Sequence, residues 1–382
     1  MLRISADLAL RTIESSLRSI QREPDQKISL PLDVRGKSLG GEAALVQLLI
    51  TWAQVARHPT IHLPVQHLSG VQIDDFVRNL HGLAVSLLCD SALDLQESEY
   101  FDPLQANGLL KLAQLDGREP LSALHRLHDF ALLCADHLGR GQPRFLYFKD
   151  PATNTAVRNE SDFRRLSNWI VRSITPEDYQ SKTTEAFSNA VGSMIHEIFE
   201  NTDEHATTDL HGHALSKSLR GLFAKHHLLT DRQIEELTID NPALRRFCLE
   251  IPKSGNTRRL LEVSIFDSGP GLAQRVSNRS LSDLTTPEEF AAVQGCFRKG
   301  VSTKPRAGHG IGLHYVLGLL KERRGFLRVR TGRLSLYGDL SSYDTSSGDL
   351  NLALKDASDS EPRRLGRVCG TLITIMAPLM RS

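Results

Sequence analysis

The sequence predicts an α/β protein with two domains, and three observations lead to that prediction. The chain has 382 residues, which leaves room for two domains of roughly 150 residues each. Alternating apolar and polar runs exchange with segments of helical periodicity through residues 1–150. A segment rich in turn-forming residues, 150–160, then marks a junction. We therefore expect a small α/β domain over 1–150 and a second α/β domain over 151–382.

Composition excludes several functional classes. Lys and Arg number 46 against 45 Asp and Glu, so no overall charge attracts nucleic acid or an anionic membrane. The longest apolar stretch, 43–56, contains Gln47 and Gln54 and is shorter than the ~20 residues that span a bilayer. The first residues do not have the pattern of a signal peptide. The five cysteines are scattered without CxxC spacing, so we expect buried thiols in a cytoplasmic protein.

In the first domain, helices and strands are expected to alternate. Helical periodicity predicts helices over 5–21, 42–57 and 73–83, with more helix continuing to about residue 137. Strand-like patterns predict strands over 27–34, 60–65, 84–88 and 144–149. No motif in this part of the chain points to a chemical activity.

The second domain begins with a long helix, expected from Pro176 to His205. Proline and two acids after Thr175 are typical of a helix N-terminus. Within this helix Glu197, Asn201 and His205 are four residues apart, so they lie along one stripe. A carboxylate, an amide and an imidazole are therefore presented together. Taken alone, the stripe also fits the solvent-exposed face of an amphipathic helix.

A strand expected over 261–266 ends in the motif Asp267-Ser-Gly269-Pro-Gly271. A carboxylate at this place can accept a hydrogen bond from an exocyclic amine, and the glycines allow a flat ring to approach the backbone. Asp-Gly junctions are also common in ordinary turns. The motif alone therefore does not predict a function, and its interpretation depends on the other motifs in the sequence.

Three alternating glycines, Gly308, Gly310 and Gly312, precede a helix expected to continue to about Arg323. Backbone N–H groups at the start of a helix form an anion site that suits phosphates. The spacing differs from the GxGxxG fingerprint of dinucleotide-binding folds. The glycines therefore predict a phosphate site of another kind.

In order, the helical ExxxN, the DxGxG after a strand, the GxGxGL before a helix and the final Gly370-Thr371-Leu-Ile-Thr-Ile strand resemble the ATP-binding domain of the GHKL superfamily. This superfamily includes sensor histidine kinases and gyrase B. The resemblance covers roughly 175–379. It implies a Bergerat fold, an α/β sandwich in which a mixed sheet carries helices on one face.

The resemblance also implies a role for each motif residue. Asn201 would be the Mg²⁺ ligand, and Glu197 would activate water for the hydrolysis of ATP. Asp267 would bind the adenine amine. Other residues would shape the adenine pocket or wrap the phosphates: Gly269, Gly271, Thr371, Gly308, Gly310 and Gly312. The amide oxygen of Asn201 and the phosphate oxygens are hard ligands of the kind that Mg²⁺ prefers.

An ATP lid is expected over 274–307, where Lys304 is the candidate for a γ-phosphate contact. Compared with simple members of the superfamily, the chain carries an insertion at 207–259, expected to be largely helical, for example over 216–226 and 231–237. The segment 321–333 has six basic residues and one acid and is expected to form a solvated face. A long surface loop is expected over 335–362.

Three functions remain open on this reasoning. The first is an ATPase that acts as a nucleotide-dependent switch in a regulatory or defence system of bacterial type, which Glu197 favours. The second is a protein kinase of the histidine-kinase type. It would need a phosphoacceptor such as His128 on a helical hairpin, but the strand expected over 144–149 intervenes. The third is an ATP-sensing scaffold without useful turnover. The expected partners are ATP and either a protein partner or a second copy; nucleic acid is disfavoured and no membrane is expected.

Overall fold

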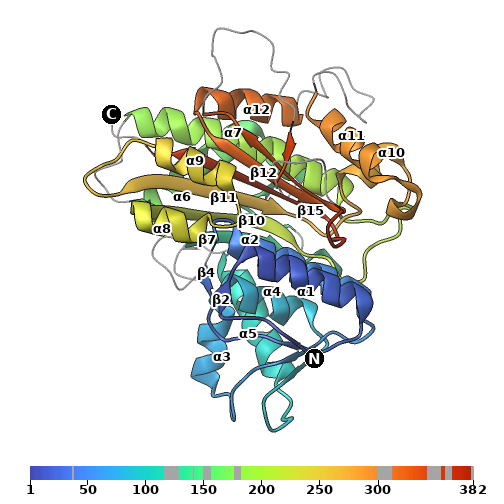
Figure 1. The fold of residues 1–382 in the computed structure, drawn as a ribbon. Helices are drawn as coiled ribbons and strands as arrows, with labels where there is room; N and C mark the ends of the chain where they lie inside the picture. Colours follow the sequence, from blue (N-terminus) through green and yellow to red (C-terminus); the bar gives the residue numbers. More distant parts are fainter. Residues whose placement is uncertain are drawn as a thin grey trace.

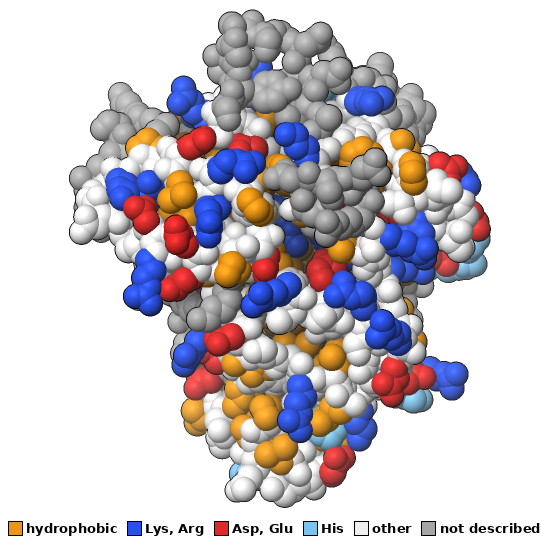
Figure 2. Space-filling model, viewed as in Figure 1, with side chains coloured by type: hydrophobic (Ala, Val, Ile, Leu, Met, Phe, Trp, Pro, Cys, Tyr) orange, Lys and Arg blue, Asp and Glu red, His pale blue; other side chains and the backbone are white. Residues whose placement is uncertain are grey.

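The computed structural model of the chain describes residues 1–36, 38–115, 129–140, 142–148, 156–175, 182–298, 312–341, 354–357 and 364–379. They form an α/β protein in which an N-terminal region lies against one face of a large sheet (Figure 1). On the face shown in Figure 2, acidic and basic side chains are interspersed over the region of the large sheet. No helix in this described part combines the length and apolar character that a membrane crossing requires.

A parallel sheet organises the N-terminal region. Its strands are short and run in the order β1 (Leu2–Arg3), β3 (Ile28–Ser29), β5 (Thr60–His62) and β6 (Ser91–Leu93). Helices connect these strands, as parallel pairing requires: α1 (Leu10–Arg22), α2 (Gly41–Val55), α3 (Gly70–Val77) and α4 (Leu80–Leu88), with α5 (Phe101–Leu115) after the last strand. A second parallel pair joins β2 (Asp7–Leu8) to β4 (Arg35–Gly36).

Several expectations for this region are confirmed and two are wrong. The helices expected near 5–21 and 42–57 are α1 and α2. The strand expected over 84–88 is wrong, because these residues belong to α4, whose nine residues are all buried and show no polar face. The helix expected to continue to 137 is also wrong, because a strand, β7 (Asp129–Cys134), lies there. A short strand, β8 (Tyr147–Phe148), lies within the strand expected over 144–149 and pairs with β9 (Ala156–Val157).

The large sheet has seven strands in the order β14-β13-β12-β15-β11-β10-β7. Besides β7, they are β10 (Arg220–Leu229), β11 (Arg258–Phe266), β12 (Phe326–Thr331), β13 (Leu334–Asp339), β14 (Lys355–Asp356) and β15 (Thr371–Pro378). Every pairing among them is antiparallel, so the expectation of a mixed sheet is wrong for these strands. Because β7 precedes residue 150, the sheet draws on both sides of the boundary that was expected there.

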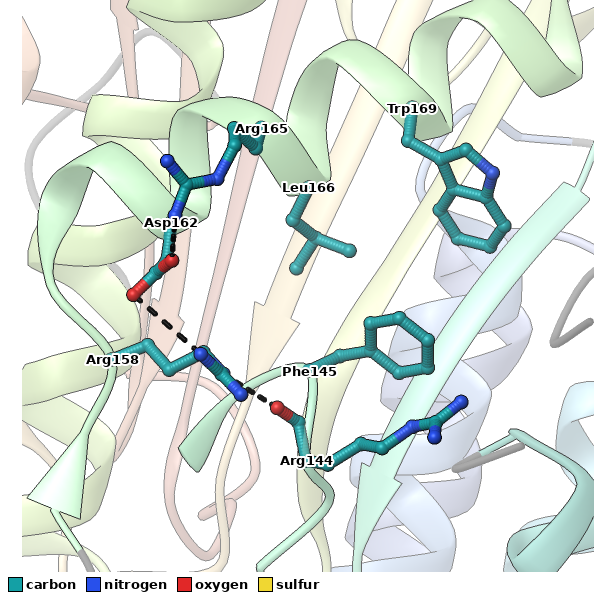
Figure 3. Close-up of a pocket in the computed structure, with 7 residues that line it drawn as sticks. All are labelled: Arg144, Phe145, Arg158, Asp162, Arg165, Leu166 and Trp169. Atoms are coloured by element: carbon teal, nitrogen blue, oxygen red, sulfur yellow. Dashed lines mark hydrogen bonds and ion pairs between the residues drawn. The ribbon is translucent and has the colours of Figure 1, made fainter. Parts of the chain in front are cut away.

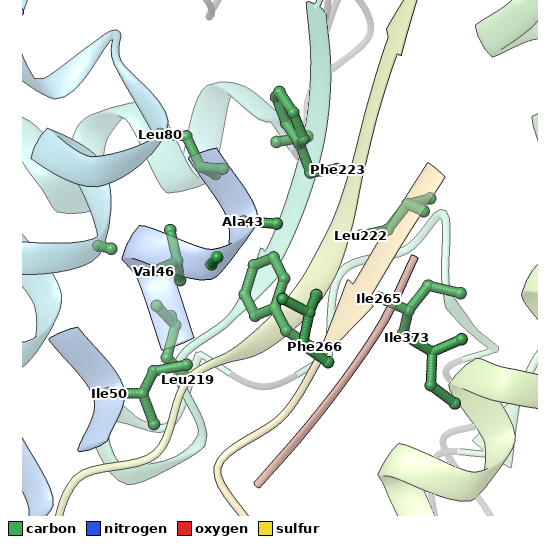
Figure 4. Close-up of a cluster of buried hydrophobic side chains, with 14 of the residues drawn as sticks. Ala43, Val46, Ile50, Leu80, Leu219, Leu222, Phe223, Ile265, Phe266 and Ile373 are labelled. Atoms are coloured by element: carbon green, nitrogen blue, oxygen red, sulfur yellow. The ribbon is translucent and has the colours of Figure 1, made fainter. Parts of the chain in front are cut away.

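Helices cover both faces of this sheet. One face carries α6 (Glu160–Ile174), α7 (Lys182–His205) and α12 (Gly312–Glu322) (Figure 1). The opposite face packs against α2, where Figure 4 shows Phe223 and Phe266 pointing toward the helix. Successive residues of a strand point to opposite faces, so Leu222 and Ile265 point away from α2. The expectation of helices on one face only is therefore wrong.

The segment 207–259 contributes a strand to this sheet and is not simply a helical insertion. The helix expected over 216–226 is wrong, because β10 occupies most of it. The strand is buried along most of its length between two helical layers, so its sequence lacks clean period-2 alternation. The helix expected over 231–237 is confirmed as α8 (Asp231–Leu237), and α9 (Pro242–Glu250) follows it.

The basic segment 321–333 is largely internal. Arg328, Arg330 and Arg333 are buried on β12 and in the turn after it. Arg330 donates to both carboxylate oxygens of Glu14 on α1, at 2.8 and 3.0 Å, and Arg333 donates to Glu289 at 2.6 Å. The expected solvated face is therefore wrong for these side chains.

Two further expectations concern a loop and the thiols. The surface loop expected over 335–362 is wrong at its start, because β13 extends to Asp339 and β14 follows later; most of what lies between is outside the described residues. All five cysteines are free, four of them buried and Cys296 half-buried.

The helices α10 (Leu272–Ser277) and α11 (Thr286–Cys296) complete the fold at the edge of the candidate site.

Candidate functional site

The start of α12 lies against the polar stripe of α7. A Cβ added at Gly312 would lie 2.9 Å from Glu197 Oε2 and 3.8 Å from Asn201 Nδ2. The side chain of Glu197 is 25% exposed, so it is neither buried in the core nor fully solvated. Ile198 and Phe199 are buried beside it and hold α7 on the sheet. The stripe is thus covered in part by the helix that follows the alternating glycines.

Asn201 has one polar atom engaged and one available. Its Nδ2 donates to the backbone oxygen of Glu197, one turn earlier, at 2.9 Å. Among the described residues no group donates to its Oδ1. An amide oxygen held in this way, beside a helix N-terminus, suits a Mg²⁺ ion that keeps several waters and takes phosphate oxygens as its other ligands. The third member of the stripe, His205, lies at the end of α7 and pairs with Glu204 at 3.7 Å.

Asp267 lies between the end of β11 and the start of β15. Its Oδ1 accepts hydrogen bonds from the backbone N–H of Gly269 at 2.8 Å and of Thr371 at 3.2 Å. The backbone N–H of Asp267 donates to the oxygen of Thr371 at 3.0 Å. Within the described part of the chain, Oδ2 has no hydrogen-bond donor. The carboxylate is therefore fixed by one oxygen and presents the other.

Burial raises the pKa of Asp267 to about 6 from its ordinary value of 3.8. The two backbone donors, together with the charges of Arg220 and Arg275, act in the opposite direction and favour the ionised form. A ligand that donates a hydrogen bond to Oδ2 would add to this second group of effects. A donor at Oδ2 would therefore lower the pKa of Asp267 and stabilise the ionised carboxylate.

The glycines around Asp267 are required by close backbone approach. A Cβ at Gly269 would lie 2.7 Å from Ala206 Cα, just after the end of α7. Gly271 has φ +94°, and its Cβ would lie 2.8 Å from Thr331 Oγ1. A Cβ at Gly370 would lie 1.8 Å from Asp267 O. Protein atoms thus occupy the Cβ position of each of these glycines, and the absence of side chains there lets three backbone segments meet around the carboxylate.

Two hydroxyl groups complete this corner of the sheet. Thr371 Oγ1 and Thr331 Oγ1 are 3.2 Å apart, and Thr331 also accepts from the backbone N–H of Leu272 at 3.1 Å. Thr331 was not among the predicted site residues. Its only signal in the sequence is its place before Gly332, where β12 turns into β13.

Helix α2 contacts the site from the face of the sheet opposite α7. No sequence motif indicated this contact. Gln54 Nε2 donates to the backbone oxygen of Ser268 at 2.8 Å and to that of Lys217 at 3.0 Å. Thr51 Oγ1 accepts from the backbone N–H of Cys369 at 2.9 Å. The two residues therefore hold the backbone on either side of the pair formed by Asp267 and Thr371. Gln54 appeared in the sequence only as an interruption of an apolar stretch.

A buried arginine ties the end of α7 to β10. Arg220 donates to both oxygens of Asp136 at 2.8 and 2.9 Å, and it lies 3.2 Å from Asp203 on α7. Its guanidinium also lies over the rings of Tyr147 and Phe199, at 5.4 and 5.5 Å. Sequence reasoning missed Arg220 because it fell in a segment predicted as helix.

Part of the predicted site falls outside the described residues: Lys304, Gly308, Gly310 and residues 299–307 of the expected lid. The structure brings together Glu197, Asn201 and Gly312 at one end of the site and Asp267, Gly269, Gly271 and Thr371 at the other. Among the described side chains no group of three or more His, Cys, Asp or Glu is arranged to hold a metal ion. Comparisons with protein-family models, curated proteins and solved structures found no match to the chain.

Proposed function

We propose that the chain binds Mg-ATP in a Bergerat-type site of the GHKL kind and acts as a nucleotide-dependent switch. One observation carries the proposal: three motifs, distant in the sequence, meet along α7. Gly312 from the third motif lies against Glu197 and Asn201 of the first, and Gly269 from the second lies against Ala206 at the end of the same helix. At one end of the proposed site is the carboxylate of Asp267, which suits an amine. At the other end is the N-terminus of α12, which suits phosphates.

Recognition of adenine would rest on Asp267. Its Oδ2 has no donor among the described residues and can accept a hydrogen bond from the exocyclic amine. Oδ1 stays fixed by Gly269 and Thr371, so the carboxylate does not need to reorient when the ring arrives. A base that lacks the amine would leave this buried carboxylate without a donor, which is costly. The site therefore selects adenine over thymine or uracil.

The phosphates would lie near the start of α12. Gly312, the first residue of α12, lies against Glu197 and Asn201, and the positive end of the helix would favour anions there. Asn201 Oδ1 would hold Mg²⁺, which supplies neutralisation of phosphate charge when it is bound. Glu197 would accept a proton from the attacking water.

A switch also requires that the rest of the chain respond to the nucleotide. Gln54 and Thr51 connect α2 to the backbone beside Asp267, so a shift of that backbone on binding would change contacts of the N-terminal region. The setting in a regulatory or defence system of bacterial type is proposed from the resemblance alone. So is the target of the switch, either a protein partner or a second copy of the chain.

The test is ATP binding and turnover by the full chain with Mg²⁺, measured by calorimetry and by the fate of radiolabelled γ-phosphate. Asp267→Asn is expected to weaken ATP binding at least about tenfold, because an amide N–H₂ replaces the acceptor for the amine. Asn201→Ala should remove the dependence of binding on Mg²⁺. Glu197→Ala should retain binding and abolish phosphate release, whereas Glu204→Ala on the same helix should behave as wild type.

The outcomes separate the three functions. Released phosphate without labelled protein supports the ATPase switch, and stable label on a protein supports the kinase. Binding without either supports the scaffold. If the wild-type chain does not bind ATP, the proposal fails.

A further inference from the structure

A pocket lies at the β7 edge of the large sheet, between α6 and the segment that precedes β8 (Figure 3). Its volume is about 320 Å³. Phe145 and Trp169 form its aromatic wall, with rings that are parallel to within 2° and centroids 5.9 Å apart. Phe130 of β7 contacts Trp169 edge-on at 5.5 Å, and Leu166 is buried beneath. The two rings are therefore held in place and present flat surfaces.

The pocket also concentrates positive charge. Three guanidinium groups line it, from Arg144, Arg158 and Arg165, against the single carboxylate of Asp162. Arg165 pairs with that carboxylate and Arg158 lies 3.7 Å from it. The Arg144 guanidinium lies over the Phe145 ring, 5.0 Å from its centroid. Guanidinium groups stay charged at all physiological pH values, so the residues that line the pocket contribute three positive charges and one negative charge.

We infer that this pocket binds a nucleotide through its base and its phosphate, as a free nucleotide or as the end of a single-stranded nucleic acid. Aromatic side chains stack on bases of any type, and guanidinium groups bind phosphate oxygens in pairs. The volume is at the lower end of the range for small-molecule sites, which suits one base with its phosphate. Both sources of the ligand share this chemistry.

The inference does not depend on the proposed ATP site. Trp169 packs on β7, at the edge of the sheet, whereas Asp267 follows β11, which lies two strands further in. The one carboxylate among the residues that line this pocket, Asp162, is paired with Arg158 and Arg165. Thymidine monophosphate, which has no exocyclic amine, therefore probes this pocket and not the site of Asp267.

The tryptophans supply a local readout. The chain has two, and Trp52 is fully buried in the N-terminal region, where its Nε1 donates to Gln26 O at 3.0 Å. Quenching by an added ligand therefore reports on Trp169. Thymidine monophosphate should quench this fluorescence with saturation, and thymidine without phosphate should do so at least about tenfold more weakly, because it lacks the group that the arginines bind.

A short single-stranded oligothymidine separates the two sources. Binding at least about tenfold tighter than that of the monophosphate identifies nucleic acid, and equal binding identifies a free nucleotide. Arg144→Gln should weaken binding of the monophosphate about tenfold, whereas Arg172→Gln, exposed on the same α6 but outside the pocket, should not change it. Absence of saturable quenching, or equal effects of the two substitutions, would overturn the inference.

Discussion

In the parallel sheet of the N-terminal region each strand has two or three residues, whereas β10 and β11 of the antiparallel sheet have ten and nine. The short strands exchange few hydrogen bonds, so this region relies on the burial of α2 and α4, which are buried nearly all round. The long strands form continuous ladders that fix the backbone up to the strand ends.

This difference explains where the candidate site lies. Asp267 and Thr371 stand where two paired strands end and begin, so the ladder sets the position of the carboxylate. In the described part of the N-terminal region, side chains of α2 and not a strand ladder make the contacts with the site. The antiparallel sheet fixes the position of the Asp267 carboxylate, and α2 connects the N-terminal region to the backbone beside it.

The largest expected effect tests whether the two regions unfold together. Phe266 is fully buried and points toward α2, so Phe266→Ala should lower the free energy of unfolding by ~3–5 kcal/mol. Phe76→Ala, in α3 of the N-terminal region, should cost a similar amount. Urea denaturation followed by circular dichroism and by tryptophan fluorescence should show one shared transition for both variants. Separate transitions would show that the N-terminal region and the large sheet unfold independently, and that α2 does not join them into one unit.

A second prediction concerns pH. Since the pKa of Asp267 is raised to about 6, the folded chain binds more protons than the unfolded chain between pH 3.8 and pH 6. The stability that this group contributes is therefore fully present below pH 3.8 and is lost as the pH rises through 6. Asp267→Asn should raise the free energy of unfolding near neutral pH by up to ~3 kcal/mol and leave it little changed below pH 3.8.

The measurement is urea denaturation of wild type and Asp267→Asn over a pH series. An equal gain at every pH would contradict the assigned pKa. In the same variant ATP binding is expected to weaken, so the two effects have opposite signs, as is typical of a residue whose burial serves a ligand.

A smaller effect is expected at the ion pair that joins α1 to β12. The Arg330 guanidinium is 2% exposed and Glu14 is 15% exposed, so Glu14→Gln leaves a buried charge poorly compensated. We expect a loss of ~1–3 kcal/mol in the free energy of unfolding. Glu236→Gln removes a pair with exposed Arg232 within α8 and should cost less than ~1 kcal/mol. Equal losses in thermal and urea denaturation would show that burial does not distinguish the two pairs.

The finest test compares two glutamines of α2. Gln54 donates to Ser268 O, next to Asp267, whereas Gln47 donates to Arg330 O in β12, next to Thr331 and not to Asp267. Substitution of either by Leu should cost ~1–2 kcal/mol of stability, because carbonyl groups lose a donor. Only Gln54→Leu should also weaken ATP binding, by several-fold in calorimetry. If both variants bind ATP like wild type, α2 supports the fold without acting on the site.

Much of the fold could be predicted where local pattern and tertiary environment agree. The helix at α2 and the strand at β11 follow from apolar patterning, and α8 begins with a capping box in which Thr230 and Gln233 bond to each other's backbone. Prediction failed where burial on all sides removes periodicity. Neither α4 nor β10 has a polar face to reveal its period, so residues 84–88 of the first were predicted as a strand and residues 220–226 of the second as helix.

The motifs of the candidate site could be predicted from the sequence, but the residues that hold those motifs in place could not. The spacing of Glu197 and Asn201 follows from helical geometry, and the structure adds that Gly312 faces them. Arg330 and Gln54 could not be identified, because their partners lie more than 200 residues away in the sequence. Distant partners leave no local pattern, so the buried arginines were predicted as a solvated face.

The place of β15 bears on how the chain is made. This strand lies in the middle of the large sheet, between β12 and β11, yet it leaves the ribosome after every other described strand of that sheet. Until it is synthesised, β11 has one edge without a partner and Asp267 lacks the donor from Thr371. The N-terminal region emerges first, with the face of α2 that later packs on the sheet still uncovered. The nascent chain therefore passes through a period in which open strand edges and an apolar helix face are exposed together, the state in which chaperones bind growing chains.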